Sequence, residues 1–265
     1  MTDAPFSMVP LPAERSTKPR TTGITMMMDW GLAQRRAEDY MELLAPYVDL
    51  VKIVVGTARL YPEEVLVRKL GFYKDNDVTP FLGGQFSEYV YATQGWAGME
   101  PFFHEARRLG FDALEISDNC VPLDDAERAR MIETAVGCGL EVHGEVGSKV
   151  ITQSADEIIA QARICLEAGA DVVLVEGAEL VDADGRPIED MVRALKDGMD
   201  LSKTLFELTG PWIKGVSLES IYRLKLFLLD EFGRDVNLAN VMPDDVLETE
   251  AARVGLSVVG PKVAE

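Results

Sequence analysis

The sequence alternates short apolar runs with longer amphipathic stretches from about residue 18 to the C-terminal region. Eight of the apolar runs have the length of buried strands. They span residues 23–29, 49–56, 78–84, 113–118, 141–147, 171–177, 204–209 and 236–241. A stretch with helical spacing of apolar residues follows each run, so the pattern predicts a series of strand–helix units.

The limits of several helices can be predicted from single residues. Ser154, with Glu157 three residues later, forms a capping box that predicts the start of a helix. Gly110, Gly139 and Gly169 each come shortly before an expected strand and are typical of helix ends. These signals support the alternation of strands and helices.

Eight consecutive strand–helix units indicate a parallel sheet, and eight strands are the number that closes a barrel. An open, doubly wound sheet usually has fewer strands and a glycine-rich turn after the first one. Here the first strand ends in Asp29-Trp30-Gly31 without that motif, and Gly147-Ser148-Lys149 lacks the upstream glycine of a P-loop. The predicted fold class is therefore α/β, with a single (β/α)8 TIM barrel over residues 18–265.

The first 17 residues differ from the rest of the chain. They contain Pro5, Pro10 and Pro12 and no apolar signal core, so residues 1–17 are predicted to form an extended, flexible arm. No apolar stretch has the length of a membrane span. We therefore expect a cytoplasmic protein that does not enter membranes.

Charge and composition narrow the classes of partner. The 265 residues include 45 acidic and 26 basic side chains, for a formal net charge of −19. Such an excess opposes binding to nucleic acid or anionic membranes, although a few buried lysines or arginines can still hold a small anionic substrate. The three scattered cysteines fit a reducing compartment, and two histidines are too few for a multi-histidine zinc site.

Charged residues recur near the carboxyl ends of the predicted strands, where TIM barrels carry their catalytic groups. Glu115, Glu145, Glu176 and Glu207 come from four different strands and are expected to converge at one mouth. Buried carboxylates need a cation, and oxygen ligands alone select Mg²⁺ or Mn²⁺. With positive charge or proton transfer from Lys52 and Lys149, such a site suits enolate chemistry.

Each charged residue also has a structural interpretation when it is taken alone. Asp29 or Asp118 is more often a helix cap than a catalyst, and Lys52 can be a buried bridge to one carboxylate. His143 lies in mid-strand and is expected to be a hydrogen-bonded barrel residue.

Several motifs resemble the phosphosulfolactate synthase family over most of the chain, in collinear order. They are Lys18-Pro19-Arg20-x-x-Gly23-Ile24-Thr25-Met26, Val51-Lys52-x-x-x-Gly56-Thr57, Leu60-Tyr61-Pro62-x-Glu64-Val65-Leu66, Gly83-Gly84, Leu109-Gly110-Phe111-x-Ala113-x-Glu115-Ile116-Ser117-Asp118, Glu145-Val146-Gly147-x-Lys149 and Val236-Asn237-Leu238-x-Asn240-Val241. The resemblance implies a TIM-barrel lyase that adds sulfite to phosphoenolpyruvate in the presence of Mg²⁺. The product, (2R)-phospho-3-sulfolactate, enters coenzyme M biosynthesis.

The resemblance also implies roles for individual residues. Sulfite attacks C3, Mg²⁺ stabilises the enediolate and Lys149 protonates C2, with Lys52 and Glu145 as further catalytic residues. The implied ligands of Mg²⁺, for which Mn²⁺ can substitute, are Glu115, Glu145 and Glu176. The implied substrate-binding residues are Lys18, Arg20, Lys52, Gly83, Gly84, Ser117 and Asn240. A homo-oligomer is expected as well.

The later loops depart from the family pattern. Ala178 stands where the family has an arginine, Gln85 replaces a threonine, and residues 207–211 replace the family's Glu-Ala-Pro segment. Two alternatives therefore stay open. One is a related lyase or synthase that applies the same Mg²⁺-enolate chemistry to another carboxylate substrate, and the other is a non-catalytic, stress-associated homologue.

Overall fold

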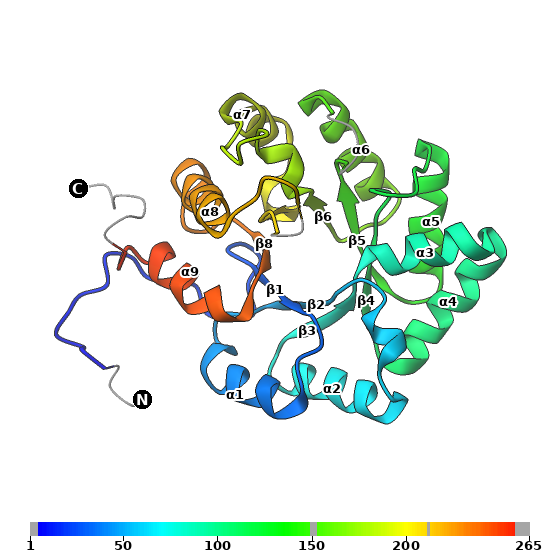
Figure 1. Cartoon of the computed structure of the whole chain (residues 1–265), viewed down its shortest axis with the longest axis horizontal. Coiled ribbons are helices and arrows are strands. Elements are labelled where there is room, and N and C mark those ends of the chain that lie inside the picture. Colours follow the sequence, from blue (N-terminus) through cyan, green and yellow to red (C-terminus); the bar gives the residue numbers. More distant parts are fainter. Residues whose placement is uncertain (1–4, 149–152, 211–212, 258–265) are drawn as a thin grey trace.

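The computed structural model describes residues 5–148, 153–210 and 213–257, which form a closed barrel of eight parallel strands in sequence order (Figure 1). The strands are β1 (Thr25–Asp29), β2 (Leu50–Ile53), β3 (Thr79–Leu82), β4 (Ala113–Ile116), β5 (Glu141–Val146), β6 (Val172–Val175), β7 (Thr204–Glu207) and β8 (Leu238–Val241). The predicted (β/α)8 barrel is confirmed, and every strand falls within its predicted run.

Helices surround the barrel on its outer side. They are α1 (Gln34–Leu44), α2 (Glu63–Asp75), α3 (Gly84–Gln94), α4 (Trp96–Leu109), α5 (Asp125–Gly137), α6 (Ala155–Glu167), α7 (Glu189–Gly198), α8 (Leu218–Phe232) and α9 (Val246–Arg253). Short 3-10 turns lie at η1 (Thr57–Leu60), η2 (Gly177–Leu180), η3 (Leu201–Lys203) and η4 (Pro243–Asp245). Two helices connect β3 to β4, because Gly95 (φ 61°) ends α3 and begins α4. None of the helices in the described residues is long and apolar enough to cross a membrane.

The predicted helix limits are present in the structure. The Ser154 side chain accepts a hydrogen bond from the Glu157 N–H, and the Glu157 carboxylate returns one from the Ser154 N–H. Gly110, Gly139 and Gly169 all have positive φ, as residues that end helices commonly do. Local signals therefore set several of the boundaries between helices and strands.

The interior of the barrel changes from apolar to charged along the strands. Its lower layer is a small cluster of Met26, Phe81, Ala113, Leu174, Leu205 and Ala239. Two residues further along a strand, the side chain points to the same face. Ala113, Leu174 and Leu205 are thus followed by Glu115, Glu176 and Glu207. An apolar plug closes the amino-terminal end and a charged layer lies towards the carboxyl-terminal end.

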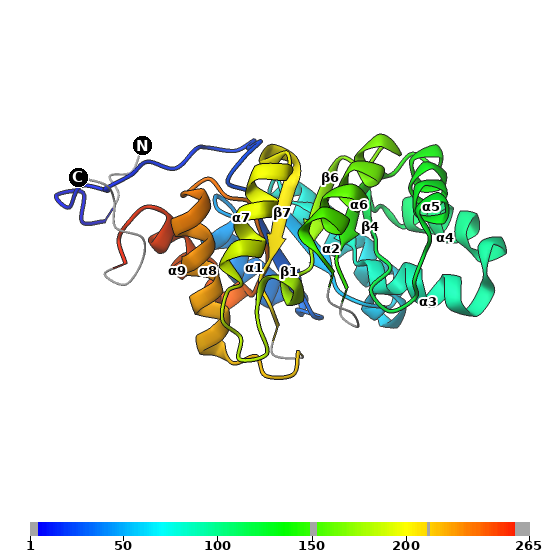
Figure 2. The same ribbon diagram turned by 90° about the horizontal axis from the view of Figure 1, so that it is seen from above.

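Lys18 and Arg20 lie at the amino-terminal end of the barrel. The Lys18 ammonium donates to the carbonyls of Ala45 (3.0 Å) and Val48 (2.7 Å). Arg20 forms an ion pair of 2.9 Å with Asp49, which directly precedes β2. Figure 2 shows the N-terminal segment along one edge of the molecule, opposite the edge towards which β7 points. The substrate-binding role expected for Lys18 and Arg20 is therefore corrected: both side chains fasten the N-terminal segment to the base of the barrel.

Candidate active site

A cavity of about 220 Å³ opens among the carboxyl-terminal ends of the strands. Its charged lining consists of Lys52, Glu115, Glu145, Glu176 and Glu207. A larger groove of about 730 Å³ lies on the outside of the barrel beside α2 and α4, where mainly apolar side chains line it. We assign the candidate active site to the smaller cavity because it holds the buried titratable groups.

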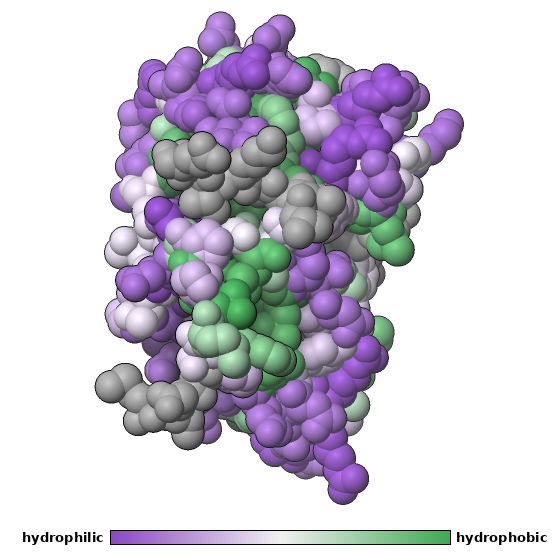
Figure 3. Space-filling model, turned by 90° about the vertical axis from the view of Figure 1, so that its left-hand side faces the viewer, coloured by the Kyte–Doolittle hydropathy of each residue, from purple (hydrophilic) through white to green (hydrophobic). Residues whose placement is uncertain are grey.

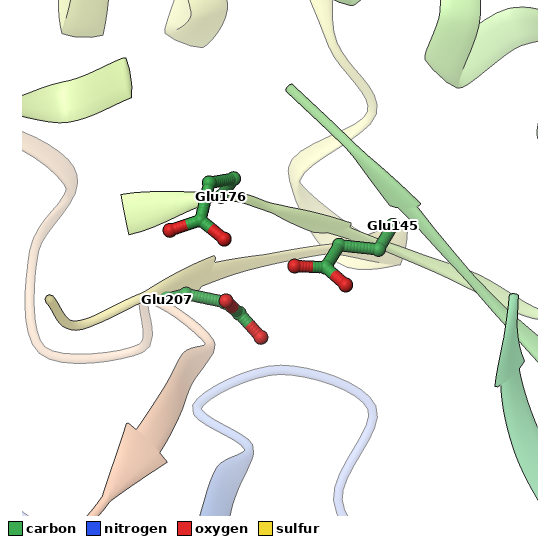
Figure 4. A group of neighbouring side chains, drawn as sticks. All are labelled: Glu145, Glu176 and Glu207. Carbon is green, nitrogen blue, oxygen red and sulfur yellow. The ribbon is translucent and has the colours of Figure 1, made fainter. Parts of the chain in front are cut away.

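Three of these carboxylates form a compact group, which we call the carboxylate triad: Glu145, Glu176 and Glu207. They come from β5, from the residue after β6 and from the end of β7. All three are buried, and one oxygen of each lies within 4.8 Å of the others. Figure 4 shows the three carboxylates directed towards a common region. This oxygen-only donor set is the kind that binds Mg²⁺ or Mn²⁺.

Lys52 balances part of the acidic charge. Its ammonium nitrogen lies 2.7 Å from Glu115 Oε2 and 2.8 Å from Glu207 Oε1. Burial by itself would lower the pKa of Lys52, but the carboxylates of Glu115, Glu207 and Glu145 outweigh that effect and raise it. The expected placement of Lys52 at the mouth is correct, and it bridges two carboxylates rather than the single one considered above.

Glu115 is held between Lys52 and the start of α3. Its Oε1 accepts a hydrogen bond of 2.9 Å from the Gly84 N–H. Burial raises the pKa of Glu115 well above its ordinary value, although Lys52 opposes the shift. Among the residues that the structure describes, the group close enough to share a metal contains Glu207 and not Glu115. The predicted ligand set thus differs from the observed cluster at this position.

Gly84 allows this close packing. A Cβ atom at Gly84 would lie 2.4 Å from Ser117 Oγ and 2.9 Å from Glu115 Oε1. Gly83 also lines the cavity, as expected. Gly84, the first residue of α3, can therefore approach Glu115 only because it lacks a side chain.

Asn240 enters the cavity through an irregularity in β8. The pairing of β1 with β8 contains a bulge, and Asn240 has a φ of 60°, which asparagine tolerates better than most residues. Its side-chain oxygen is buried and has no hydrogen-bond partner within the part of the chain that the structure describes. The bulge therefore presents an unsatisfied acceptor beside the cavity that Asn240 lines.

Ser117 and Lys149 are the remaining predicted site residues. The Ser117 hydroxyl donates a short hydrogen bond to Glu88, and Ser117 is not among the residues that line the cavity. Its expected contact with substrate is therefore replaced by a contact that holds the loop after β4. Lys149 lies outside the described residues, so its proton-donor role stays a prediction.

The contacts of Asp29 and Asp118 are structural but are not the helix caps that were expected, because Ala33 is the N-cap of α1 and Asp124 is the N-cap of α5. Asp29 accepts hydrogen bonds from the N–H groups of Gly31 and Leu32, at 2.8 and 2.7 Å. Asp118 pairs with Arg128 through both of its oxygens. Each aspartate fastens the loop that follows its strand.

His143 is buried below the mouth. Burial lowers the pKa of His143 to about 4, with a smaller contribution from Lys52, so the ring is neutral. It packs edge-on against Phe81, with 4.5 Å between ring centroids. Among the described residues its Nδ1 has no hydrogen-bond partner, so this nitrogen does not make the hydrogen bond that was expected.

Glu179 is a buried polar residue that the sequence reasoning did not single out. Its carboxylate accepts hydrogen bonds from the N–H groups of Ser148 (2.9 Å) and Gln153 (3.3 Å). A signal was present in the sequence, because a second glutamate follows Glu176 in the loop after the sixth predicted strand. Glu176 and Glu179 are three residues apart.

Comparisons with known proteins agree with this geometry. The family model described as (2R)-phospho-3-sulfolactate synthase (ComA) matches residues 13–258. The phosphosulfolactate synthase of Methanothermobacter thermautotrophicus is 34% identical over 252 residues, which cover 91% of this chain and 92% of the relative. The phosphosulfolactate synthase of Methanocaldococcus jannaschii is 33% identical and covers 88% of this chain and 92% of the relative. That of Bacillus subtilis is 27% identical and covers 91% of this chain and 93% of the relative.

Solved structures agree on the fold alone. A 3-hexulose-6-phosphate synthase from Salmonella typhimurium superposes with a TM-score of 0.55 at 13% identity, over 88% of this chain and 99% of that one. The YdjI aldolase of Escherichia coli superposes with a TM-score of 0.53 at 13% identity, over 91% of this chain and 83% of that one. Both identities are too low to carry an argument about chemistry.

Proposed function

The chain belongs to the (2R)-phospho-3-sulfolactate synthase (ComA) family, and we propose that it adds sulfite to phosphoenolpyruvate to form (2R)-phospho-3-sulfolactate. This is a carbon–sulfur bond-forming reaction of the lyase class, whose product enters coenzyme M biosynthesis. Family membership over nearly the whole chain favours this activity over the two alternatives that the altered loops left open.

The reaction sets two requirements for the site. The sulfur lone pair of sulfite forms a bond to C3, and the electrons of the C2=C3 double bond move towards C2 and the carboxylate. No atom leaves, so C2 must receive one proton to complete the product. The site therefore has to stabilise added negative charge and deliver a single proton.

The observation that carries the proposal is the carboxylate triad at the mouth of the barrel. Three buried carboxylates repel one another unless a cation joins them, and their oxygens suit a hard divalent ion. We assign Glu145, Glu176 and Glu207 as the residues that would hold Mg²⁺ or Mn²⁺. When bound, the ion would supply positive charge for the substrate carboxylate as negative charge builds on it.

The remaining groups of the mouth divide the other tasks. Lys52 is fixed between Glu115 and Glu207, so it acts as a stationary positive charge for an anionic substrate. The unsatisfied side-chain oxygen of Asn240 offers a polar contact to the substrate. Lys149, by the resemblance, delivers the proton to C2. In these assignments Lys52 and the bound ion stabilise the added negative charge, and Lys149 delivers the single proton.

A direct assay tests the proposed function. Purified protein is incubated with Mg²⁺, phosphoenolpyruvate and sulfite, and the products are followed by mass spectrometry. We expect phosphosulfolactate to accumulate only when both substrates are present. Unchanged phosphoenolpyruvate, in protein that is folded and binds Mn²⁺, would contradict the proposal and favour a different carboxylate substrate.

A further inference from the structure

Glu179 links the loops that follow β5 and β6. It lies in η2, and its two carboxylate oxygens accept hydrogen bonds from Ser148 N and Gln153 N. These two residues are the described neighbours of residues 149–152 on either side. A single carboxylate thus holds both described ends of the loop after β5.

Burial of the Glu179 carboxylate costs free energy that its hydrogen bonds must offset. The residue is only 3% exposed, and a buried carboxylate is unfavourable unless hydrogen bonds satisfy it. Burial raises the pKa of Glu179, while the bonds from Ser148 and Gln153 act in the opposite direction. An apolar side chain would fill the same space without that cost, so the hydrogen bonds explain the carboxylate.

Gly147 brings the two loops into direct contact. It has a φ of 98°, and a Cβ atom there would lie 3.0 Å from Glu176 Cβ and 3.0 Å from Glu179 Cγ. One loop runs from Glu145 to Ser148 and the other from Glu176 to Glu179. Both therefore start at a member of the carboxylate triad and meet again at the Glu179 carboxylate.

We infer that Glu179 is a positioning residue that fixes how the loops after β5 and β6 leave the barrel, and so where Glu145 and Glu176 of the carboxylate triad are held. The two loops start at Glu145 and Glu176 and meet at Gly147, Ser148 and Glu179, so loss of the Glu179 contact would also displace two members of the carboxylate triad. The inference rests on the proposed function, in which the carboxylate triad takes part in the reaction. A misplacement of about 1 Å in a reacting group can lower a rate by about a hundredfold.

The test compares two glutamine variants that differ in position but not in chemistry. In Glu179→Gln, the side-chain oxygen can accept one backbone N–H, while the amide NH₂ group faces the other N–H and cannot accept from it. The control is Glu157→Gln. Glu157 also accepts a backbone N–H in this region, from Ser154 at 2.7 Å, but it is exposed.

Two measurements decide the outcome. Hydrogen exchange of at least one of the Ser148 and Gln153 amides should become about tenfold or more faster in Glu179→Gln, because one of the two loses its acceptor. Exchange of both amides should stay unchanged in Glu157→Gln. The kcat of Glu179→Gln should fall by about 10- to 100-fold with a nearly unchanged KM for phosphoenolpyruvate, whereas Glu157→Gln should keep its kcat. Unchanged exchange in Glu179→Gln, or equal loss of kcat in both variants, would overturn the inference.

A second variant covers the case in which Glu179→Gln does not fold. Glu179→Asp keeps two acceptor oxygens on a shorter stem, so we expect exchange and kcat between those of the wild type and the loss expected for glutamine. Wild-type values for both would contradict a positioning role. Amide exchange needs no substrate, so it decides the loop contact even if the assay with sulfite and phosphoenolpyruvate fails.

Discussion

Lys52 on β2 and Glu207 on β7 form a buried ion pair of 2.8 Å between strands that are not neighbours in the barrel. The same ammonium group lies 2.7 Å from Glu115 on β4. Lys52 therefore joins three strands through ion pairs, and its ammonium also donates a hydrogen bond to Glu207. Its removal would leave two buried carboxylates without their cation, next to the other members of the carboxylate triad.

Replacement of Lys52 should affect both stability and activity. We expect Lys52→Met to lower the free energy of unfolding by about 3–5 kcal/mol, the usual cost when one partner of a buried ion pair is removed. Denaturant titration of the metal-free protein measures this change. Lys74→Met is the control, since Lys74 pairs with Asp112 at the surface and should cost about 1 kcal/mol or less. Equal losses for the two variants would refute a central role for Lys52.

Gly84 offers a test of the packing around Glu115. Gly84→Ala places a methyl group against Ser117 and Glu115, so it should lower both the melting temperature and the rate of product formation. Gly71→Ala is the matched control, because Gly71 lies within α2 and nothing lies within 4 Å of its added Cβ. We expect that variant to gain about 0.5–1 kcal/mol from helix propensity. A Gly84→Ala protein with wild-type stability and activity would show that the contact is unimportant.

Lys149 is the proposed proton donor to C2. Lys149→Ala should lose about two to four orders of magnitude in turnover, the usual contribution of a general acid. Lys149→Arg keeps the charge but holds its proton too tightly near neutral pH, so it should be almost as impaired. Single-turnover kinetics of both variants, with saturating phosphoenolpyruvate and sulfite, distinguish a proton donor from a charge partner. An arginine variant with near wild-type turnover would make Lys149 a charge partner and not the proton donor.

The N-terminal segment supports the expectation of a homo-oligomer. Phe6 and Met8 are 78% and 80% exposed, and Leu247 on α9 is also exposed. Figure 3 shows an apolar area on this side of the molecule, surrounded by hydrophilic residues. Because exposed apolar areas commonly mark association surfaces, light scattering should give a mass that is a multiple of one chain. A single-chain mass at micromolar concentration would contradict this prediction.

The fold could be predicted from the sequence because its signals are local and repeated. Apolar runs, capping residues and helix-ending glycines such as Gly110 and Gly169 each act within a few residues of the chain. The convergence of the four glutamates also followed from the fold, because parallel strands bring their carboxyl ends to one mouth. The split of the β3–β4 connection at Gly95 was not anticipated, since one glycine can fall within or between helices.

The role of each residue in the site could not be predicted in the same way, because it depends on contacts between residues that are far apart in the sequence. Lys18 and Arg20 stand in a motif that resembles the family, but only the structure places them at the opposite end of the barrel. Glu115 and Glu207 are equivalent in the sequence pattern. Only the distances among the buried side chains show that Glu207 belongs to the carboxylate triad, while Glu115 accepts a hydrogen bond from Gly84. Which carboxylates approach one another depends on register and side-chain packing, which periodicity does not specify.

The central claim is that the carboxylate triad binds the metal on which sulfite addition depends. The most direct test measures how the rate of phosphosulfolactate formation depends on Mg²⁺ in the wild type, in Glu207→Gln and in the exposed control Glu105→Gln. We predict that EDTA abolishes the reaction of the wild type and the control, that Mg²⁺ or Mn²⁺ restores it and that Zn²⁺ does so poorly. Glu207→Gln should stay inactive at the Mg²⁺ concentration that saturates the wild type. Full activity in exhaustively chelated wild-type protein, or recovery of Glu207→Gln at the wild-type Mg²⁺ concentration, would contradict the account.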